Sequence, residues 1–218
     1  MSGEILFRIL FLVLFVPGIG VRGYYTVKVR ATRKRRSWKE RLKDTVQTEG
    51  KTGAILLISQ GIYLIVAVPL YLLFSPSLPW LELPIVDWQR WIGVALGVLS
   101  LPFLAWVHYT LDKHWDVSLS LRKDHALVTS GPYRRIRHPM YTVHIIYFFA
   151  WILVTANLLL LINYFLTILL ITLRIPKEEK MLLGRFGEEY HAYMKRTGRL
   201  LPRFHEKKER EEVRKLSN

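Results

Sequence analysis

Long apolar runs alternate with strongly polar segments along the chain, and the apolar runs are long enough to predict membrane helices. Crossing the ~30 Å hydrocarbon core of a bilayer takes about 20 residues of α-helix. Residues 52–74 form the clearest run, because none of its 23 positions carries a charge. Residues 88–109 and 5–21 form two further runs, each interrupted by one arginine. The N-terminal run is interpreted as an uncleaved helix rather than a signal peptide, because it lacks a basic start and a small-residue cleavage site.

The last apolar run, residues 141–173, is too long for a single crossing. Its 33 residues would form a helix of roughly 50 Å. The run is therefore predicted to fold back near Thr155, Ala156 and Asn157 into a hairpin of two short helices, of about 15 residues each. The predicted fold class is thus all-α, a polytopic integral membrane protein with about five transmembrane helices, of which the last two form the hairpin.

The basic residues predict how these spans are oriented. Thirty of the 32 Lys and Arg residues lie in residues 22–51, 108–139 and 174–218, whereas the loop at 75–87 and the hairpin turn hold none. Cytoplasmic loops of membrane proteins carry an excess of Lys and Arg. The three basic segments are therefore expected in the cytoplasm, with the N-terminus outside and the C-terminus cytoplasmic.

The composition excludes several classes of protein. A chain of 218 residues that is 51% hydrophobic with a net charge of +15 is neither a disordered polyelectrolyte nor a typical soluble globule. The absence of cysteine excludes disulfide frameworks, thiolate metal sites and thiol nucleophiles. The seven histidines show no metal-ligand spacing, so no metal is predicted.

Two patterns that suggest nucleotide or nucleic-acid binding have simpler explanations. Residues 18–23 match G-x-G-x-x-G, but that motif needs a strand before it and a helix after it, and neither fits the end of a membrane span. The basic cluster at residues 33–36 lies beside a span, where it is interpreted as a topogenic signal and a contact with anionic membrane lipids. No nucleic-acid partner is therefore predicted.

Candidate chemistry begins after the third span. Residues 125–133 read HALVTSGPY, and residues 137–141 read RHPMY. Pro139 at the first position of a helix would place His138 near the N-cap, where unpaired N–H groups favour a carboxylate or another anion. The basic residues could instead be only the positive flank of a fourth span. The residues alone leave both interpretations open.

A second candidate segment follows the last span. Arg174 and Glu178 are four residues apart, so in a helix they would share a face and could form a local ion pair. Arg preceding Glu is the poorer order for such a pair, and Pro176 between them is unusual in a solvated helix outside its first turn. These features weaken the local-pair interpretation without removing it.

Together, the order and spacing of these segments resemble the isoprenylcysteine carboxyl methyltransferase family and its phospholipid methyltransferase relatives, over roughly residues 91–202. The short N-terminal region resembles that of prokaryotic members. The resemblance implies a membrane enzyme with S-adenosyl-L-methionine as cofactor in a cytoplasmic pocket, and Arg174 as the catalytic residue that holds the substrate. It assigns cofactor binding to His125, Ala126, Leu127, Val128, Tyr133, His138, Pro139, Met140, Tyr141 and Glu178.

The function implied is methyl transfer to the carboxylate of a prenylcysteine-like or other lipidic acceptor, entering from the bilayer beside the hairpin. An ionised carboxylate needs no general base, so Arg174 is expected to orient rather than to deprotonate it. The alternatives are a phospholipid N-methyltransferase, a membrane lipid reductase and a non-catalytic lipid-binding scaffold. Three regions are expected: a two-span region at 1–87, a methyltransferase core at 88–204 and a charged tail at 205–218.

Overall fold

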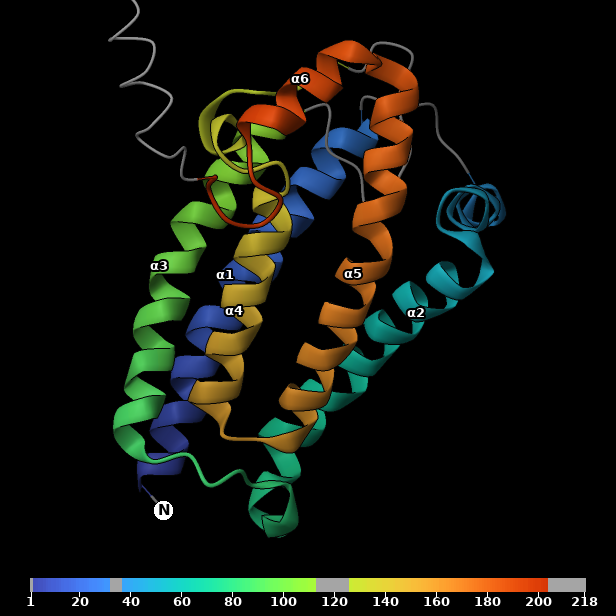
Figure 1. Cartoon of the computed structure of the whole chain (residues 1–218). Coiled ribbons are helices and arrows are strands. Elements are labelled where there is room, and N and C mark those ends of the chain that lie inside the picture. Colours follow the sequence, from blue (N-terminus) through green and yellow to red (C-terminus); the bar gives the residue numbers. More distant parts are fainter. Residues whose placement is uncertain (1, 32–36, 113–125, 204–218) are drawn as a thin grey trace, which may run out of the picture.

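A computed structural model of the chain describes residues 2–31, 37–112 and 126–203, which form a bundle of helices (Figure 1). Short 3₁₀ turns lie in the connections, namely η1 (Ser75–Ser77), η2 (Pro79–Leu81) and η4 (Gly131–Arg134). The helices are α1 (Ser2–Ala31), α2 (Trp38–Phe74), α3 (Asp87–Leu111), α4 (Pro139–Thr155), α5 (Leu158–Phe186) and α6 (Glu188–Arg196).

The predicted all-helical membrane fold is confirmed. The helices α1, α2, α3 and α5 are long enough and apolar enough to cross a membrane, and α4 is an apolar helix of 17 residues. The span count of five stays a prediction. Residues 18–23 lie inside α1 and not between a strand and a helix, in agreement with a chance match to the nucleotide motif.

The predicted hairpin is present, and its turn lies where the sequence placed it. Ala156 adopts the left-handed conformation (φ 46°), and the side chain of Asn157 caps α5 by accepting from the Leu159 N–H at 3.0 Å. The predicted length of the second arm is wrong. α5 has 29 residues, because the helix continues through Pro176. The apolar part and the second candidate segment therefore belong to one continuous helix.

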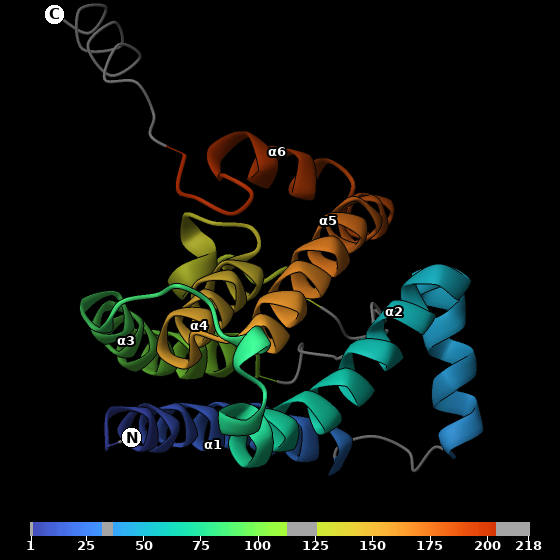
Figure 2. The same cartoon turned by 90° about the horizontal axis from the view of Figure 1, so that it is seen from below.

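α2 extends beyond the predicted span in the N-terminal direction. Ser37 and Glu40 form a reciprocal capping box that starts the helix. Gly50 then leaves helical geometry with φ 72°, a conformation that glycine tolerates without a steric cost. The first part of α2 consequently turns away from the bundle (Figure 2).

The two connections without Lys or Arg meet at one end of the bundle. The Leu83 N–H donates to the Ala156 carbonyl at 2.7 Å, and Glu82 and Asn157 form an isolated antiparallel bridge. α1 begins at this same end, whereas α6 lies at the opposite end (Figure 1). The connections without Lys or Arg thus share one end of the bundle, as the separation of basic and uncharged segments along the sequence predicted.

Arg90 lies near this end and is buried, although a membrane arginine near a helix end commonly extends toward water. Only 4% of its side chain is exposed, and its guanidinium pairs with Glu4 and donates to the Val154 carbonyl at 3.0 Å. The ring of Phe7 lies 3.8 Å from the guanidinium carbon. These contacts connect α1, α3 and α4.

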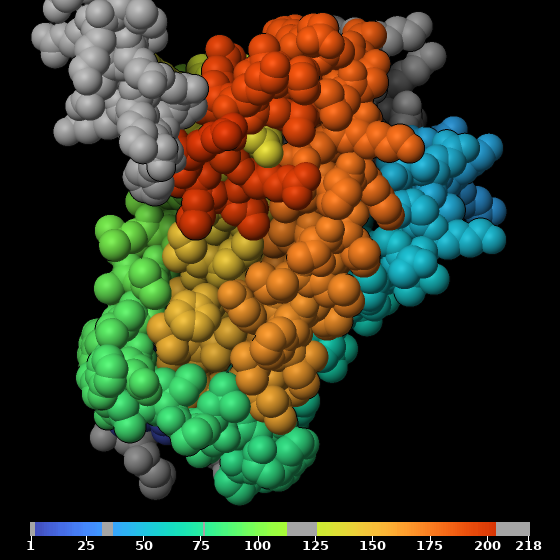
Figure 3. Space-filling view, in the orientation of Figure 1, coloured from blue at the N-terminus to red at the C-terminus, as the bar shows by residue number. Residues whose placement is uncertain are grey.

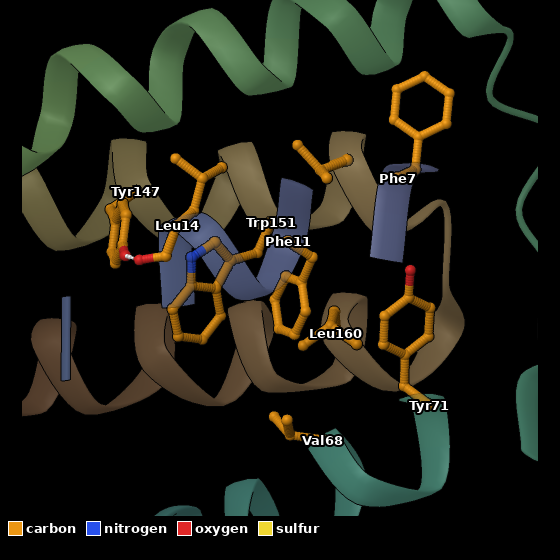
Figure 4. Close-up of a cluster of buried hydrophobic side chains, with 9 residues drawn as sticks. Phe7, Phe11, Leu14, Val68, Tyr71, Tyr147, Trp151 and Leu160 are labelled. Atoms are coloured by element: carbon orange, nitrogen blue, oxygen red, sulfur yellow. Dashed lines mark hydrogen bonds between the residues drawn. The ribbon is translucent and has the colours of Figure 1, made fainter. Parts of the chain in front are cut away.

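Aromatic side chains fill the interior between α1, α2 and α4. The ring of Phe11 lies edge-on to those of Tyr71 and Trp151, and the Tyr147 hydroxyl donates to the Leu14 carbonyl. α3 packs closely on α4, since a Cβ at Gly93 would lie 2.9 Å from the Val154 nitrogen. Figure 4 shows the buried cluster, which consists of Phe7, Phe11, Leu14, Val68, Tyr71, Tyr147, Trp151, Val154 and Leu160.

Candidate active site

The two candidate segments meet at the end of the bundle that carries α6. His138 is the N-cap residue of α4, with Pro139 at the first helical position as the sequence predicted. The His138 Nδ1 lies 3.6 Å from Oε2 of Glu178 on α5, and the Tyr141 hydroxyl donates to that same oxygen at 2.8 Å. His138 and Glu178 are thus close enough to contact one small molecule together.

The exposure of this group differs from residue to residue. The side chain of His138 is 2% exposed, whereas that of Glu178 is 27% exposed. The rings of His138 and Tyr141 stack with their centroids 5.5 Å apart. Glu178 therefore presents the accessible carboxylate of the group, against a wall of two aromatic rings.

Glu179, the neighbour of Glu178, organises the buried side of the site. Its carboxylate accepts from the Arg137 Nε at 3.1 Å and from the Arg199 Nη2 at 2.6 Å, and the His138 Nε2 lies 3.3 Å away. Only 5% of its side chain is exposed. A buried carboxylate needs such partners, and here they come from two separate parts of the chain, the start of α4 and the residues after α6.

Residues after α6 return to the start of α4 and extend this network. The Arg137 N–H donates to the Gly198 carbonyl at 2.8 Å, and the His138 N–H donates to the Arg199 carbonyl at 3.0 Å. The Thr142 hydroxyl donates to the Leu200 carbonyl at 2.6 Å. Figure 3 shows these C-terminal residues in red against α4 and α5. They hold His138 in place through its backbone.

Tyr133 lies in η4 and is buried beside this group. The Tyr193 hydroxyl of α6 donates to the Tyr133 carbonyl at 2.6 Å. Burial raises the pKa of Tyr193 to about 12, so its hydroxyl keeps its proton at physiological pH and can hold η4 in place. Burial also raises the pKa of Tyr133, with the nearby Glu178 carboxylate as the next contribution.

The other predicted cofactor residues lie in the first turn of α4 and in the coil before η4. Met140 lies in the first turn of α4, next to Pro139. Ala126, Leu127 and Val128 lie in the coil that leads into η4, where Ala126 is exposed and the other two are partly buried. His125 lies outside the described residues. Contact of these residues with a cofactor stays a prediction.

Arg174 pairs with a residue that sequence reasoning missed. Its Nη2 lies 2.9 Å from Oε1 of Glu49 on α2, and the Glu49 side chain is 1% exposed. The Lys177 ammonium donates to the Glu49 backbone carbonyl. Arg174 thus reaches across to α2, while Glu178 faces α4. The available sequence signal was a glutamate inside the basic segment 22–51, three residues before the uncharged run.

A second unpredicted contact lies between α1 and α4. The His144 Nδ1 lies 2.7 Å from the Met140 carbonyl, so Nδ1 carries the proton and Nε2 can accept. The Arg22 Nη1 lies 3.0 Å from this Nε2. A histidine inside an apolar membrane helix is itself a signal of a functional site, and residues 141–173 contain one.

A model of the "Isoprenylcysteine carboxyl methyltransferase (ICMT) family" matches residues 91–184. The matched segment contains most of α3 and α5, all of η4 and α4, and both halves of the site. The chain thus resembles this family over 94 of its 218 residues, which is less than half of its length. Its apolar helices and this resemblance together indicate an integral membrane protein.

Several curated proteins are similar to this chain over part of their length. A Protein-S-isoprenylcysteine O-methyltransferase of Schizosaccharomyces pombe is 37% identical over 94 residues, covering 39% of this chain and 37% of the relative. The Nickel-cobalt-cadmium resistance protein NccN of Alcaligenes xylosoxydans is 30% identical, covering 53% and 54%. Methanethiol S-methyltransferase 1 of Bradyrhizobium diazoefficiens is 30% identical, covering 56% and 48%. The matches thus span about a third to a half of these relatives.

The fold of this chain is also similar to a solved structure. The structure of the eukaryotic intramembrane Ras methyltransferase ICMT matches with a TM-score of 0.55 and 22% sequence identity, over 90% of this chain and 72% of that chain. The likeness extends the shared fold beyond residues 91–184. Among the described residues, no group of three or more His, Cys, Asp or Glu residues is placed to hold a metal ion.

Proposed function

We propose that this protein is a membrane methyltransferase that uses S-adenosyl-L-methionine to methylate the carboxylate of a lipidic acceptor. The observation that carries the proposal is the contact between His138 and Glu178, because it joins two segments that are distant in the sequence. The match of residues 91–184 to the methyltransferase family model supports the reaction class. The named relatives support methyl transfer but act on different acceptors, according to their names.

The donor set of the site fits S-adenosyl-L-methionine, which carries an ammonium, a carboxylate, an adenine and a sulfonium. Glu178 offers a partly exposed carboxylate for a cationic group, and Tyr141 and His138 offer aromatic faces. The start of α4 suits an anionic group. The residues that would hold the cofactor are Glu178, His138, Tyr141 and Tyr133, together with the predicted His125, Ala126, Leu127, Val128, Pro139 and Met140.

Arg174 is placed to orient the acceptor. Bound at the site, S-adenosyl-L-methionine supplies an electrophilic methyl group. A guanidinium can hold a carboxylate through two parallel hydrogen bonds, which fixes the direction of the attacking oxygen. Glu49 restrains the guanidinium from α2. Methyl transfer depends mainly on positioning and on exclusion of water, and these residues supply the positioning.

The choice of a carboxylate over an amine rests on proton balance. An ionised carboxylate attacks without losing a proton, whereas a protonated amine or a thiol must first give one up. Arg174 is the residue assigned to the acceptor, and arginine does not act as a base in proteins. A cationic side chain also suits an anionic acceptor better than a phospholipid ammonium.

The proposal predicts that the purified full chain binds S-adenosylhomocysteine in calorimetric titration. Replacing Glu178 by Gln should weaken binding by roughly tenfold to a hundredfold, since a hydrogen bond to a charged group contributes about 1.5–3 kcal/mol. Thr172→Val, at an exposed position of α5, serves as the matched control and should bind like the wild type. Binding of a nicotinamide cofactor instead of S-adenosylhomocysteine would favour the reductase and contradict the proposal.

We further propose that the site faces the cytoplasm, with the N-terminus outside. The chain has no cysteine, so one introduced thiol reports a single position. A membrane-impermeant maleimide should label Ser77→Cys, in the exposed connection after α2, in intact cells. It should label Glu188→Cys, at a side chain that is 99% exposed, only after permeabilisation. The reverse pattern would overturn the orientation.

A further inference from the structure

α2 and α5 share a polar seam in the apolar part of the bundle, formed by Gln60, Tyr63, Asn163 and Thr167. The Tyr63 hydroxyl donates to the Leu159 carbonyl at 3.0 Å, and the Gln60 amide donates to the Thr167 hydroxyl. Asn163 lies between these two contacts in sequence. Polar residues at membrane depth are costly to bury and usually have a function.

Asn163 is the residue of this seam that the fold leaves unsatisfied. Its side chain is fully buried, with 0% exposure. Neither the amide nitrogen nor the amide oxygen hydrogen-bonds to any described residue. A buried amide without partners is unfavourable, and in hydrocarbon no solvent relieves it. The unpaired amide therefore requires a partner that both accepts and donates a hydrogen bond.

The geometry of α5 relates Asn163 to the proposed active site. At 3.6 residues per turn, Arg174 lies only about 20° around the helix from Asn163, and Glu178 about 60°. At 1.5 Å per residue, Arg174 lies about 16 Å further along the axis. Thr172 lies about 180° away from Asn163 and is exposed. Asn163 and the two site residues consequently share one face of a single helix.

The arrangement of α2 against α5 strengthens this relation. The two helices lie close at the end of the hairpin turn and diverge towards the end that carries α6 (Figures 1 and 2). Contacts between them continue along the shared face, from Tyr63 near the turn to the pair of Glu49 and Arg174. The polar seam and the guanidinium of Arg174 thus lie along the same contact between α2 and α5.

We propose that the polar seam is a hydrogen-bonding subsite for the acceptor tail. It takes an amphiphile whose tail carries a hydroxyl or an amide about 16 Å from the end that meets Arg174. A hydroxyl or an amide both donates and accepts, as the two atoms of the Asn163 amide require. The inference deepens the proposed function. It rests on that function because it assumes that Arg174 holds the carboxylate end of the acceptor.

The test compares two matched fatty acids on the purified full chain in detergent. Stearate and 12-hydroxystearate share a carboxylate and a tail length and differ in one hydroxyl part-way along the tail. The wild-type protein should bind 12-hydroxystearate about tenfold more tightly, the effect of one hydrogen bond in an apolar setting. Asn163→Leu should abolish the difference, while Thr172→Val on the opposite face should preserve it. Asn163→Ala serves in its place if the leucine variant does not fold.

Equal affinity of the wild type for both acids would overturn the inference, and so would a preference that survives in the Asn163 variants. Either result would mean that water alone satisfies the amide. The measurement is separate from methyl transfer, because it uses neither donor nor turnover. A wild-type protein that does not bind S-adenosylhomocysteine would contradict the proposed function. The ratio of its affinities for the two fatty acids would still test the polar seam.

Discussion

Replacing Glu179 by alanine is expected to lower the free energy of unfolding by about 3 kcal/mol, as is common when one partner of a buried ion pair is removed. The variant leaves the guanidinium of Arg137 buried without its carboxylate, since only 10% of that side chain is exposed. It also removes the acceptor beside the His138 Nε2. S-adenosylhomocysteine binding should also fall, by roughly tenfold to a hundredfold, because the buried His138 ring loses the acceptor that holds it beside Glu178.

Two further variants separate the roles of Glu179. Arg199→Gln should cost less than Glu179→Ala, because the Arg199 side chain is 56% exposed and Glu179 keeps its bond from Arg137. Glu179→Gln keeps one oxygen acceptor and should lie between the wild type and the alanine variant. Thermal unfolding in detergent and calorimetric titration measure both properties. A Glu179→Ala protein with normal cofactor affinity would show that the network does not support the site.

Replacing Arg174 by lysine is expected to reduce kcat by about a hundredfold while leaving S-adenosylhomocysteine affinity within a factor of two or so. A lysine keeps the charge but cannot hold a carboxylate through two parallel hydrogen bonds, and small errors of position cost about a hundredfold in rate. The affinity should persist because the donor is assigned to Glu178 and its neighbours on the α4 side. Initial rates and calorimetry on the same preparation give the two numbers.

The neighbouring Lys177 supplies a matched control for this change. Its side chain contacts the backbone of Glu49 rather than the carboxylate, so Lys177→Arg exchanges the same two residue types in the opposite direction. That variant should keep most of the activity. Equal losses in both variants would mean that the α2 contact as a whole, and not the guanidinium of Arg174, governs the rate.

Much of the fold followed from the sequence because bilayer thickness limits helix length. The length of residues 141–173 alone required a hairpin, and Ala156 and Asn157 form its turn. The extent of α5 was missed, because the prediction took the end of the apolar run at residue 173 as the end of the helix. Proline inside a helix removes one backbone hydrogen bond, and here the helix continues through it.

The site was predictable in part for a different reason. His138, Tyr141 and Glu178 lie in segments whose order and spacing are shared by a family, and the structure brings these three side chains into contact. Glu49 and Arg22 lie in the N-terminal region, outside the matched residues 91–184. Their partners are fixed by how α1 and α2 pack on the core, and spacing along the sequence does not encode that packing.

The bonds between residues 198–200 and the start of α4 have a consequence for biosynthesis. Gly198 pairs with Ile136 in a parallel bridge, and the Arg199 carbonyl holds the His138 N–H. A ribosome makes residues 198–200 after residues 139–186, so each nascent chain contains the hairpin before it can order His138. A chain halted at the end of α5 would have its membrane helices but not the bonds that hold the His138 backbone.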